Sequence, residues 1–332
     1  MNIASFGEVM LRLTPPNFMV LEQTDQLTMS FVGTGVNLLG SLSRFGQKTS
    51  MVSKIPNNAL GLAALSELRK LGIGTEFMGF SGDHMGSFFV ELGYGLRPTQ
   101  VTYQNRVNSS FCQAGAGAYG IEGIVSQSNW VHICGITLSL TKQTREAALK
   151  LAKETSHQGK NLCFDFNYRP SLNEGNTLQE MRGYYQEMLR HATLVFGSLR
   201  DLTDLMGMEI NKELPPIERL RQGGAAFMKE YDIPYFAGTI RNGHQLTGFI
   251  FRDGELHLSQ PVELKVLDRI GGGDAYAAGI LHGLASGWET EYLLKFAVAN
   301  AALAHSTFGD TPLATENQVK QFMDNPTLDL VR

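Results

Sequence analysis

Apolar runs alternate with amphipathic stretches along most of the chain. The runs at 162–166 (LCFDF) and 193–197 (TLVFG) are almost wholly apolar, as central parallel strands are when helices cover both faces of their sheet. Other stretches, such as 36–45, 60–71 and 178–189, carry apolar residues at helical spacing. This alternation predicts an α/β domain with a mainly parallel central sheet.

Two segments depart from this pattern and predict a separate small β-sheet. Residues 86–95 (GSFFVELGYG) and 98–105 (PTQVTYQN) alternate apolar and polar side chains and are joined by a turn-like stretch, which indicates a hairpin. Met10–Leu13 alternates in the same way. We therefore expect a small β lid formed by segments at about 9–31 and 84–112.

The rest of the chain predicts further strand–helix units. A strand at 130–136 is expected to lead into one helix that reaches about residue 157, and a short helix is expected at 199–206. A second hairpin turns at Asp253-Gly254, a dipeptide suited to a tight turn. Two helices, Ala275–Ser286 and Glu291–Ser306, are expected to close the chain.

Composition narrows the class of protein. The chain has 332 residues, 43% of them hydrophobic, and a net charge of −4, which gives no electrostatic footprint for nucleic acid or an anionic membrane. Cys112, Cys134 and Cys163 lie in apolar runs and are expected to be buried free thiols. No apolar run approaches membrane-spanning length and no secretory leader opens the chain. We expect a soluble, cytoplasmic protein.

Three consecutive glycines mark the strongest candidate site. Gly271, Gly272 and Gly273 lie between a β-type run at 262–267 and a helical run that begins near Asp274. Amide hydrogens at the positive end of a helix suit a phosphate or a developing oxyanion. An acid beside such an anion hole is unfavourable unless it takes up a proton, so Asp274 is the candidate general base. The alternative is a glycine-rich turn with Asp274 as an ordinary N-cap.

The sequence around these glycines has a family resemblance. Residues 268–274 (DRIGGGD) resemble the D-T-x-G-A-G-D signature of the ribokinase-like (PfkB) carbohydrate kinases, with departures at Arg269 and Gly272. The sequence of this motif is most similar to that of the branch that contains the 2-keto-3-deoxygluconate kinases. Gly7-Glu8 followed by MLRLTPP resembles the G-E-x-x-x-R-x-x-P opening of sugar-acid kinases. The resemblance implies a ribokinase-like three-layer sandwich with 1–332 as a single kinase domain.

The resemblance also implies an activity. It predicts ATP-dependent phosphorylation of a primary hydroxyl on a sugar acid, with 2-keto-3-deoxy-D-gluconate and its 6-phosphate as the expected pair. ATP and Mg²⁺ are the implied cofactors, and activation by a monovalent cation stays open. Because the lid strands of the family often pair two subunits, a homodimer or a higher homo-oligomer through the lid is expected.

Substrate contacts follow from the resemblance as well. In the family, the glycines of a turn and the asparagine after it hold sugar hydroxyls, a D-x-N-x-R-P motif faces substrate or phosphate, and a lid tyrosine and arginine contact the substrate, the arginine at its carboxylate. The expected substrate-binding residues are Gly33, Gly35, Asn37, Tyr94, Tyr103, Arg106, Asn167, Arg169 and Asp274. Each has a plainer explanation as a cap, a surface residue or an interface residue.

Nucleotide and metal contacts complete the implied site. The family's N-x-x-E motif, linked to magnesium and phosphate, aligns with Ser198–Asp201, so Asp201 would contact the metal through water. The family's nucleotide loop, K-x-G-x-x-G, corresponds to 239–243. The expected nucleotide-binding residues are Ser198, Thr239, Arg241, Gly243, Gly271, Gly273 and Asn300. An asparagine on an apolar helix, such as Asn300, is equally suited to a polar place in the core.

Three rival functions remain open. A fructokinase or another neutral-sugar kinase would share the site but not the carboxylate contact. A non-catalytic sugar-binding protein would keep the pocket without needing Asp274. The stretch Gly115–Gly120 matches G-x-G-x-x-G, but the acidic residue expected about twenty positions later is absent, which argues against a nicotinamide dehydrogenase. A Walker A pattern is absent too, so a nucleotide would be held by another device.

Overall fold

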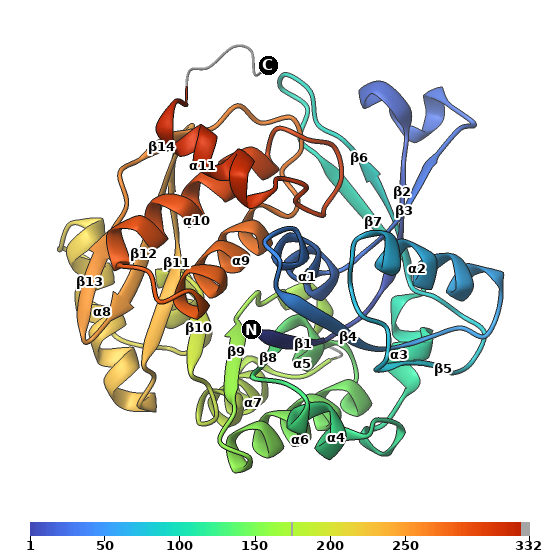
Figure 1. Ribbon diagram of the computed structural model, residues 1–332, viewed down its shortest axis with the longest axis horizontal. Coiled ribbons are helices and arrows are strands. Elements are labelled where there is room, and N and C mark those ends of the chain that lie inside the picture. Colours follow the sequence, from blue (N-terminus) through green and yellow to red (C-terminus); the bar gives the residue numbers. More distant parts are fainter. Residues whose placement is uncertain (174, 327–332) are drawn as a thin grey trace.

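A large sheet forms the centre of the computed structural model, which describes residues 1–173 and 175–326 (Figure 1). Its strands are β1 (Asn2–Phe6), β4 (Lys48–Ile55), β5 (Met78–Phe80), β8 (Trp130–Cys134), β9 (Asn161–Asp165), β10 (Leu194–Phe196), β11 (Tyr235–Asn242), β12 (Gln245–Arg252), β13 (Glu255–Leu258) and β14 (Val262–Glu263). They follow the order β13-β12-β11-β10-β9-β8-β1-β4-β5, and β14 pairs with β12. Pairs from β11 to β5 are parallel, whereas β12 runs antiparallel to its neighbours. The mainly parallel sheet is confirmed.

Helices cover both faces of this sheet. One face carries α3 (Ser110–Gln113), α4 (Ile121–Ser126), α5 (Ile136–Leu140), α6 (Lys142–His157), α7 (Leu178–Leu189) and α8 (Pro216–Tyr231). The other face carries α1 (Thr34–Arg44), α2 (Ala59–Lys70), α9 (Gly272–Ala285), α10 (Thr290–Ala304) and α11 (Glu316–Asp324). Each set packs on the sheet through its own buried apolar cluster. The predicted three-layer arrangement is therefore confirmed.

The small β-sheet is also confirmed. Its strands are β2 (Met10–Thr14), β3 (Thr28–Val32), β6 (Ser87–Glu91) and β7 (Gln100–Gln104), in the order β3-β2-β6-β7 (Figure 1). We call these four strands the lid sheet. Its inner face has a separate apolar cluster of Met10, Val32, Phe88, Val90 and Leu92. The lid sheet is thus a unit with its own core, standing at one side of the main sheet.

Several predicted elements differ from the structure in detail. The helix expected to reach residue 157 is two helices, because Thr141 caps a new helix by accepting a hydrogen bond from the Thr144 amide. The helix expected at 199–206 is a π-helical turn at Asp201–Leu205. The β-type run at 262–267 forms only the two-residue strand β14. The hairpin at Asp253-Gly254 is confirmed, with positive φ values of 54° and 80°.

The expectation that two helices close the chain is wrong, because α11 follows them. It begins with a capping box in which Thr315 accepts from the Gln318 amide and the Gln318 side chain accepts from Thr315. Val319 and Met323, on the apolar side of α11, are buried. The T-x-x-Q pattern was present in the sequence as a helix-start signal, so this element could have been found.

Helices α9 and α10 pack closely through a glycine. A Cβ at Gly279 of α9 would lie 2.5 Å from the Cα of Ala297 in α10. Gly183 of α7 is also helical, but a Cβ there would meet nothing within 4 Å. The two glycines therefore allow the same substitution to be made in opposite environments.

Gly279→Ala should lower the free energy of unfolding by about 1–3 kcal/mol, because the helices must move apart to admit the methyl group. The matched control, Gly183→Ala, should raise it by about 0.4–1 kcal/mol, since alanine only reduces the freedom of the unfolded chain. Urea unfolding of both variants measures the difference. Equal effects of the two substitutions would contradict the close packing of α9 on α10.

Candidate active site

A cavity of about 880 Å³ opens at the carboxyl ends of β9, β10 and β11. The beginnings of α1 and α9, which lie side by side (Figure 1), and the lid sheet complete its wall. This edge is where open α/β sheets gather their ligands. Of the residues expected in the site, those that line the cavity are Gly33, Asn37, Tyr103, Arg106, Asn167, Arg169, Ser198, Asp201, Thr239, Gly271, Gly273 and Asp274.

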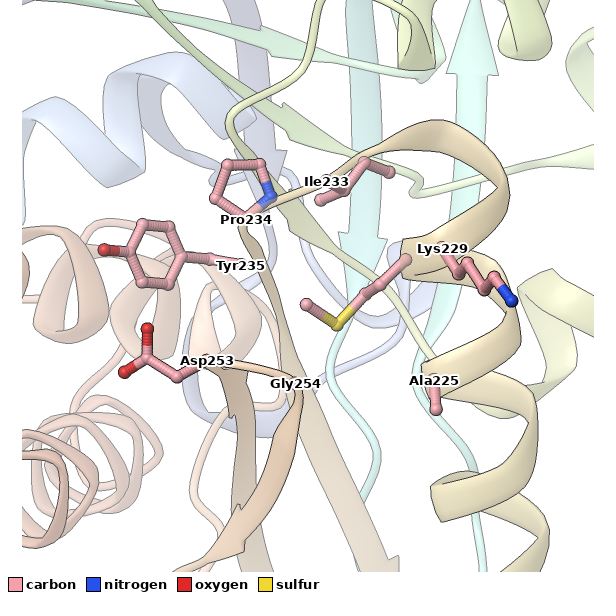
Figure 2. A pocket seen from close by; sticks show the side chains of 8 residues that line it. Ala225, Lys229, Ile233, Pro234, Tyr235, Asp253 and Gly254 are labelled. Carbon is pink, nitrogen blue, oxygen red and sulfur yellow. The ribbon is translucent and has the colours of Figure 1, made fainter.

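A second cavity of about 370 Å³ lies at the other end of β11, between α8 and the β12–β13 turn (Figure 2). Its polar side chains are Lys229, Tyr235 and Asp253. Figure 2 shows the amino group of Lys229 turned away from the other two. None of the expected site residues lies there, so the larger cavity is the candidate active site.

The glycine triplet forms the start of α9 instead of a loop before it. Gly271 takes a positive φ of 86° and caps the helix, whose first residue is Gly272. The first ladder bond runs from the Ala275 amide to the Gly271 carbonyl, at 2.9 Å. The amides of Gly272, Gly273 and Asp274 therefore lie outside the helical ladder, at the positive end of the helix. We call these three amides the anion hole; its position is shifted by one residue from the expected one.

The three glycines serve different purposes. A Cβ at Gly271 would lie 1.8 Å from the carbonyl oxygen of Asp310, and one at Gly272 would lie 2.2 Å from the ring of His305. A Cβ at Gly273 would meet nothing within 4 Å. Gly273 thus leaves open space toward the cavity it lines, whereas Gly271 and Gly272 are required by close packing behind it.

Asp274 lies at the third position of α9, where it shares the cavity with α1. The Asn37 side-chain amide donates to Asp274 Oδ2 at 2.7 Å, and Thr311 donates to Asn37 Oδ1 at 3.2 Å. Burial raises the pKa of the Asp274 carboxyl well above its usual range, and the Asn37 hydrogen bond lowers it in part. A carboxylate of raised pKa beside helix amides is suited to take up a proton.

A pair of carboxylates, Asp165 and Asp201, lines the same cavity. Asp165 ends β9, and burial raises its pKa to about 7, with the neighbouring Asp201 adding to the rise. Asp201 Oδ2 accepts from both the amide and the hydroxyl of Ser198, each at 2.7 Å. Asp165 was not among the expected site residues, although it opens the D-x-N-x-R-P motif. Asn167 of that motif has a positive φ of 34°, which turns the chain along the cavity wall.

Arginines bring positive charge to the same cavity. Arg169 follows β9, and Arg269 precedes the anion hole. Burial and repulsion from Arg269 both lower the pKa of Arg241. Arg241 and Gly243 themselves are exposed at the β11–β12 turn, outside the cavity lining. Arg269 therefore takes the place at the cavity wall that was expected for Arg241.

Arg106 is an ion-paired residue, not an unengaged cation. Its Nε donates to Glu8 Oε2 at 2.7 Å, and its guanidinium lies 5.1 Å from the ring centroid of Tyr103. One guanidinium nitrogen, NH1, is buried without a hydrogen-bond partner among the described residues. Arg106 thus keeps the two N–H donors of NH1 for a ligand, while Glu8 pairs with its charge.

Besides Arg241 and Gly243, four expected residues do not line the cavity. Tyr94 is 72% exposed at the far turn of the lid sheet. Gly35 packs against Ser5 behind the α1 turn, and Gly272 packs as described above. Asn300 is fully buried, and its amide donates to the Ser41 hydroxyl and the Ala275 carbonyl. Asn300 therefore lies in the core as a polar residue, outside the cavity lining.

The fold and the site define a phosphotransferase-like arrangement, with an acid and free helix amides at the edge of a lid-covered α/β sandwich. The family model described as pfkB family carbohydrate kinase matches residues 1–317, and the chain belongs to that family. In the described part of the chain, no helix is long and apolar enough to cross a membrane.

Three similar proteins carry sugar-acid kinase names. A solved structure from Enterococcus faecalis, provisionally named 2-keto-3-deoxygluconate kinase, is 48% identical, with a TM-score of 0.97 over 100% of this chain and 99% of its own. The 2-dehydro-3-deoxygluconokinase structure from Thermotoga maritima is 27% identical, with a TM-score of 0.92 over 98% of both chains. The 2-dehydro-3-deoxygalactonokinase of Haloferax volcanii is 26% identical over 97% of this chain and 96% of its own.

Asn300→Ala should lower the free energy of unfolding by about 1–3 kcal/mol, because two buried acceptors lose their donor. The KM for ATP should stay within about twofold of wild type, since the side chain contributes no binding energy to the cavity. Denaturant unfolding and steady-state kinetics measure the two effects. A tenfold rise in the KM for ATP at unchanged stability, on the order of 1.4 kcal/mol of binding, would show instead that Asn300 binds the nucleotide.

Proposed function

We propose that the protein transfers the γ-phosphoryl group of ATP to a primary hydroxyl of a keto-deoxy sugar acid. The proposed substrate is 2-keto-3-deoxy-D-gluconate and the product its 6-phosphate. The observation that carries the proposal is Asp274, half-buried beside the anion hole and hydrogen-bonded by Asn37 in a cavity that Arg169 also lines. The sugar-acid names of the similar proteins support this acceptor over a neutral sugar.

The chemistry follows from the residues at the start of α9. Asp274 accepts the proton of the primary hydroxyl as that oxygen attacks the γ-phosphorus, while the bond from the γ-phosphorus to the β–γ bridging oxygen breaks and ADP leaves. The amides of the anion hole, with Arg269 and Arg169, offset the charge that spreads over the transferred group. Asn37 holds the Asp274 carboxylate through the 2.7 Å hydrogen bond. The lid sheet excludes water, which would otherwise compete as the acceptor.

Substrate contacts divide between the body and the lid. We propose that Asn37, Asn167 and the turn at Gly33 bind sugar hydroxyls, and that Arg169 takes the substrate carboxylate. Tyr103 and the remaining NH1 donors of Arg106 add contacts from the lid side. This division differs from the initial expectation, because Glu8 already neutralises much of Arg106.

Mg²⁺ is proposed to arrive with the nucleotide phosphates. Among the described residues, no three His, Cys, Asp or Glu side chains lie close enough to hold a metal by themselves. Asp201 and Asp165 line the cavity together, and either carboxylate can accept hydrogen bonds from metal-bound water. Removal of divalent cations with EDTA tests the requirement. Assays in potassium, sodium and tetramethylammonium salts at equal ionic strength test activation by a monovalent cation.

We also propose that 1–332 forms a single catalytic domain and that the lid sheet pairs two or more subunits. The lid sheet exposes apolar side chains: Met29, on the face away from the cavity, is 53% exposed, and Val101 and Tyr103, which line the cavity, are 40% and 48% exposed. Sedimentation equilibrium of wild type and Met29→Asp tests the pairing. A cytoplasmic location is proposed because Cys112, Cys134 and Cys163 are buried and free of disulfides.

The substrate proposal is tested by ADP release from Mg-ATP with four acceptors. These are 2-keto-3-deoxygluconate, its C4 epimer 2-keto-3-deoxygalactonate, fructose and ribose. The gluconate-derived acid should give the highest kcat/KM, and both acids should exceed the neutral sugars because Arg169 binds the carboxylate. Preferred turnover of fructose would overturn the carboxylate contact while leaving Asp274 as the base.

Asp274→Asn should lower kcat by about 10²–10⁴-fold, because an amide of the same shape cannot accept the hydroxyl proton. ATP affinity should change little, since the anion-hole amides and arginines remain. Steady-state kinetics and calorimetric titration with ATP measure the two quantities. Retention of more than about a tenth of wild-type kcat would contradict the role of Asp274 as general base.

The pH dependence provides a separate test. Because protonated Asp274 cannot act as a base, kcat/KM should fall as pH decreases through its raised pKa. Asn37→Ala removes the hydrogen bond that stabilises the charged form, so the acidic limb should move to higher pH. Thr311→Val is the matched control: it loses only the contact to Asn37 Oδ1, so a smaller displacement is expected. An unmoved limb in Asn37→Ala would assign the titration to another group.

A further inference from the structure

Arg12 of strand β2 is the largest side chain that is fully buried in the described part of the chain. It extends from the lid sheet into the main domain and bonds to two carboxylates. Its NH2 donates to Asp268 Oδ2 at 2.9 Å, and its NH1 contacts Asp310. The exposed side-chain fractions of the three residues are 2%, 0% and 5%. Although burial would lower the pKa of Arg12, Asp310 and Asp268 raise it above its usual value, so the guanidinium is held as a cation.

Asp268, the first partner, is part of the loop that leads into the anion hole. Its Oδ1 accepts from the Ile270 amide at 3.2 Å, and its Oδ2 accepts from the Gly309 amide at 3.2 Å as well as from Arg12. Asp268 therefore joins two loops, one at 268–271 and the other at 305–310. Arg12 supplies the positive charge that these contacts share.

Asp310, the second partner, lines the cavity and also supports the turn at Gly271. Its carbonyl oxygen lies against Gly271, where a Cβ would come within 1.8 Å. The two Arg12 contacts thus reach both the loop that carries the anion hole and the loop on which that turn rests. A displacement of Arg12 would change the position of Gly271 from both sides.

The lid sheet and this region share apolar contacts as well. Ile270, one residue before Gly271, packs against the apolar cluster on the inner face of the lid sheet. Phe18, just beyond β2, lies 5.8 Å from the ring centroid of Phe308 on the supporting loop. The lid sheet is therefore connected to the loops that flank the anion hole by these apolar contacts and by the ion pairs of Arg12.

We propose that Arg12 is a positioning residue, through which lid strand β2 holds the anion hole in the geometry needed for phosphoryl transfer. Arg12 itself contacts neither the acceptor hydroxyl nor the phosphate, because it is not part of the cavity lining. This inference rests on the proposed function, in which the amides at the start of α9 stabilise the transferred group. A misplacement of about 1 Å in such a group is known to cost about a hundredfold in rate.

A purely structural role gives a different expectation. A buried ion cluster contributes little to stability compared with apolar residues of the same volume, whereas removal of one member leaves charges unpaired. If Arg12 served folding alone, replacing the whole cluster by uncharged residues would keep activity. If it positions the anion hole, the uncharged cluster would fold but remain slow.

The test measures kinetics and unfolding for Arg12→Ala with and without guanidinium ion at low millimolar concentration. Arg12→Ala should lower kcat by about a hundredfold, with a much smaller change in the KM for ATP. Guanidinium should fill the vacated space between Asp268 and Asp310 and raise the kcat of Arg12→Ala at least tenfold. Sodium chloride at the same concentration should not raise it. The kcat of Arg12→Lys should lie between those of wild type and Arg12→Ala, because an ammonium group cannot bond to both carboxylates as a guanidinium does.

Arg145→Ala is the matched control. Arg145 is also buried, at 6% exposure, and donates to the Leu138 carbonyl in the helical layer, outside the cavity lining. Its loss should reduce stability, and guanidinium should not raise kcat. Equal guanidinium effects in the two alanine variants would overturn the proposal.

If Arg12→Ala does not fold, the triple variant Arg12→Met/Asp268→Asn/Asp310→Asn decides, because it leaves no buried charge unpaired. Because Asp310 also lines the cavity, the reference is Asp310→Asn alone: a folded triple variant with kcat about a hundredfold below that reference supports positioning, and equal kcat overturns it. The proposed substrate can fail independently. In that case wild type transfers phosphate to a different acceptor, and the same Arg12 comparison is made with that acceptor.

Discussion

The site depends on one close approach, between the backbone of Gly271 and the carbonyl of Asp310. There is no room for a Cβ at Gly271, and its φ of 86° is one that glycine adopts without strain. This turn allows α9 to begin at the next residue, so that its first three amides lie outside the helical ladder at the end of the helix near the cavity, and Asp274 occupies the third position. The base and the anion hole are thus set by a single backbone reversal.

Electrostatics in the cavity are balanced locally. The chain carries a net charge of −4, which gives no long-range attraction for a nucleotide. The aspartates that line the cavity repel one another, and burial raises the pKa of Asp165 and Asp274. Arg169 and Arg269 oppose this charge at the wall. Bound phosphates would therefore contact the arginines, and their metal would lie near the aspartates. The positions of these side chains, and not the net charge of the chain, would then determine which ligand binds.

The sequence was sufficient for the layers, the lid sheet and the acid at the start of α9. Each of these leaves a local signal: apolar runs for buried strands, alternation for the lid, and glycines before a helix. The surroundings of two expected site residues depend on distant contacts instead. Asn300 was separated from the cavity by its bonds to Ser41 and Ala275, and Arg106 was neutralised by Glu8, 98 positions away. No periodicity could reveal such pairings.

The role proposed for Arg12 could not be predicted from the sequence for the same reason. Arg12 stands in the opening motif of the chain, but its partners lie 256 and 298 positions later. Only the fold brings β2 beside the loops that flank the anion hole.

The departures from the family signature also have a physical reason in the fold. Where the signature has alanine, this chain has Gly272, and a Cβ there would lie 2.2 Å from the ring of His305. His305 is itself held by the Ala301 carbonyl at 2.7 Å, so the ring has little freedom to withdraw. The His305 ring behind the helix therefore leaves no room for a Cβ at position 272. Arg269, the other departure, places its charge at the cavity wall, where Arg241 does not reach. The two departures from the signature are thus explained by the space behind Gly272 and by the charge that Arg269 brings to the cavity.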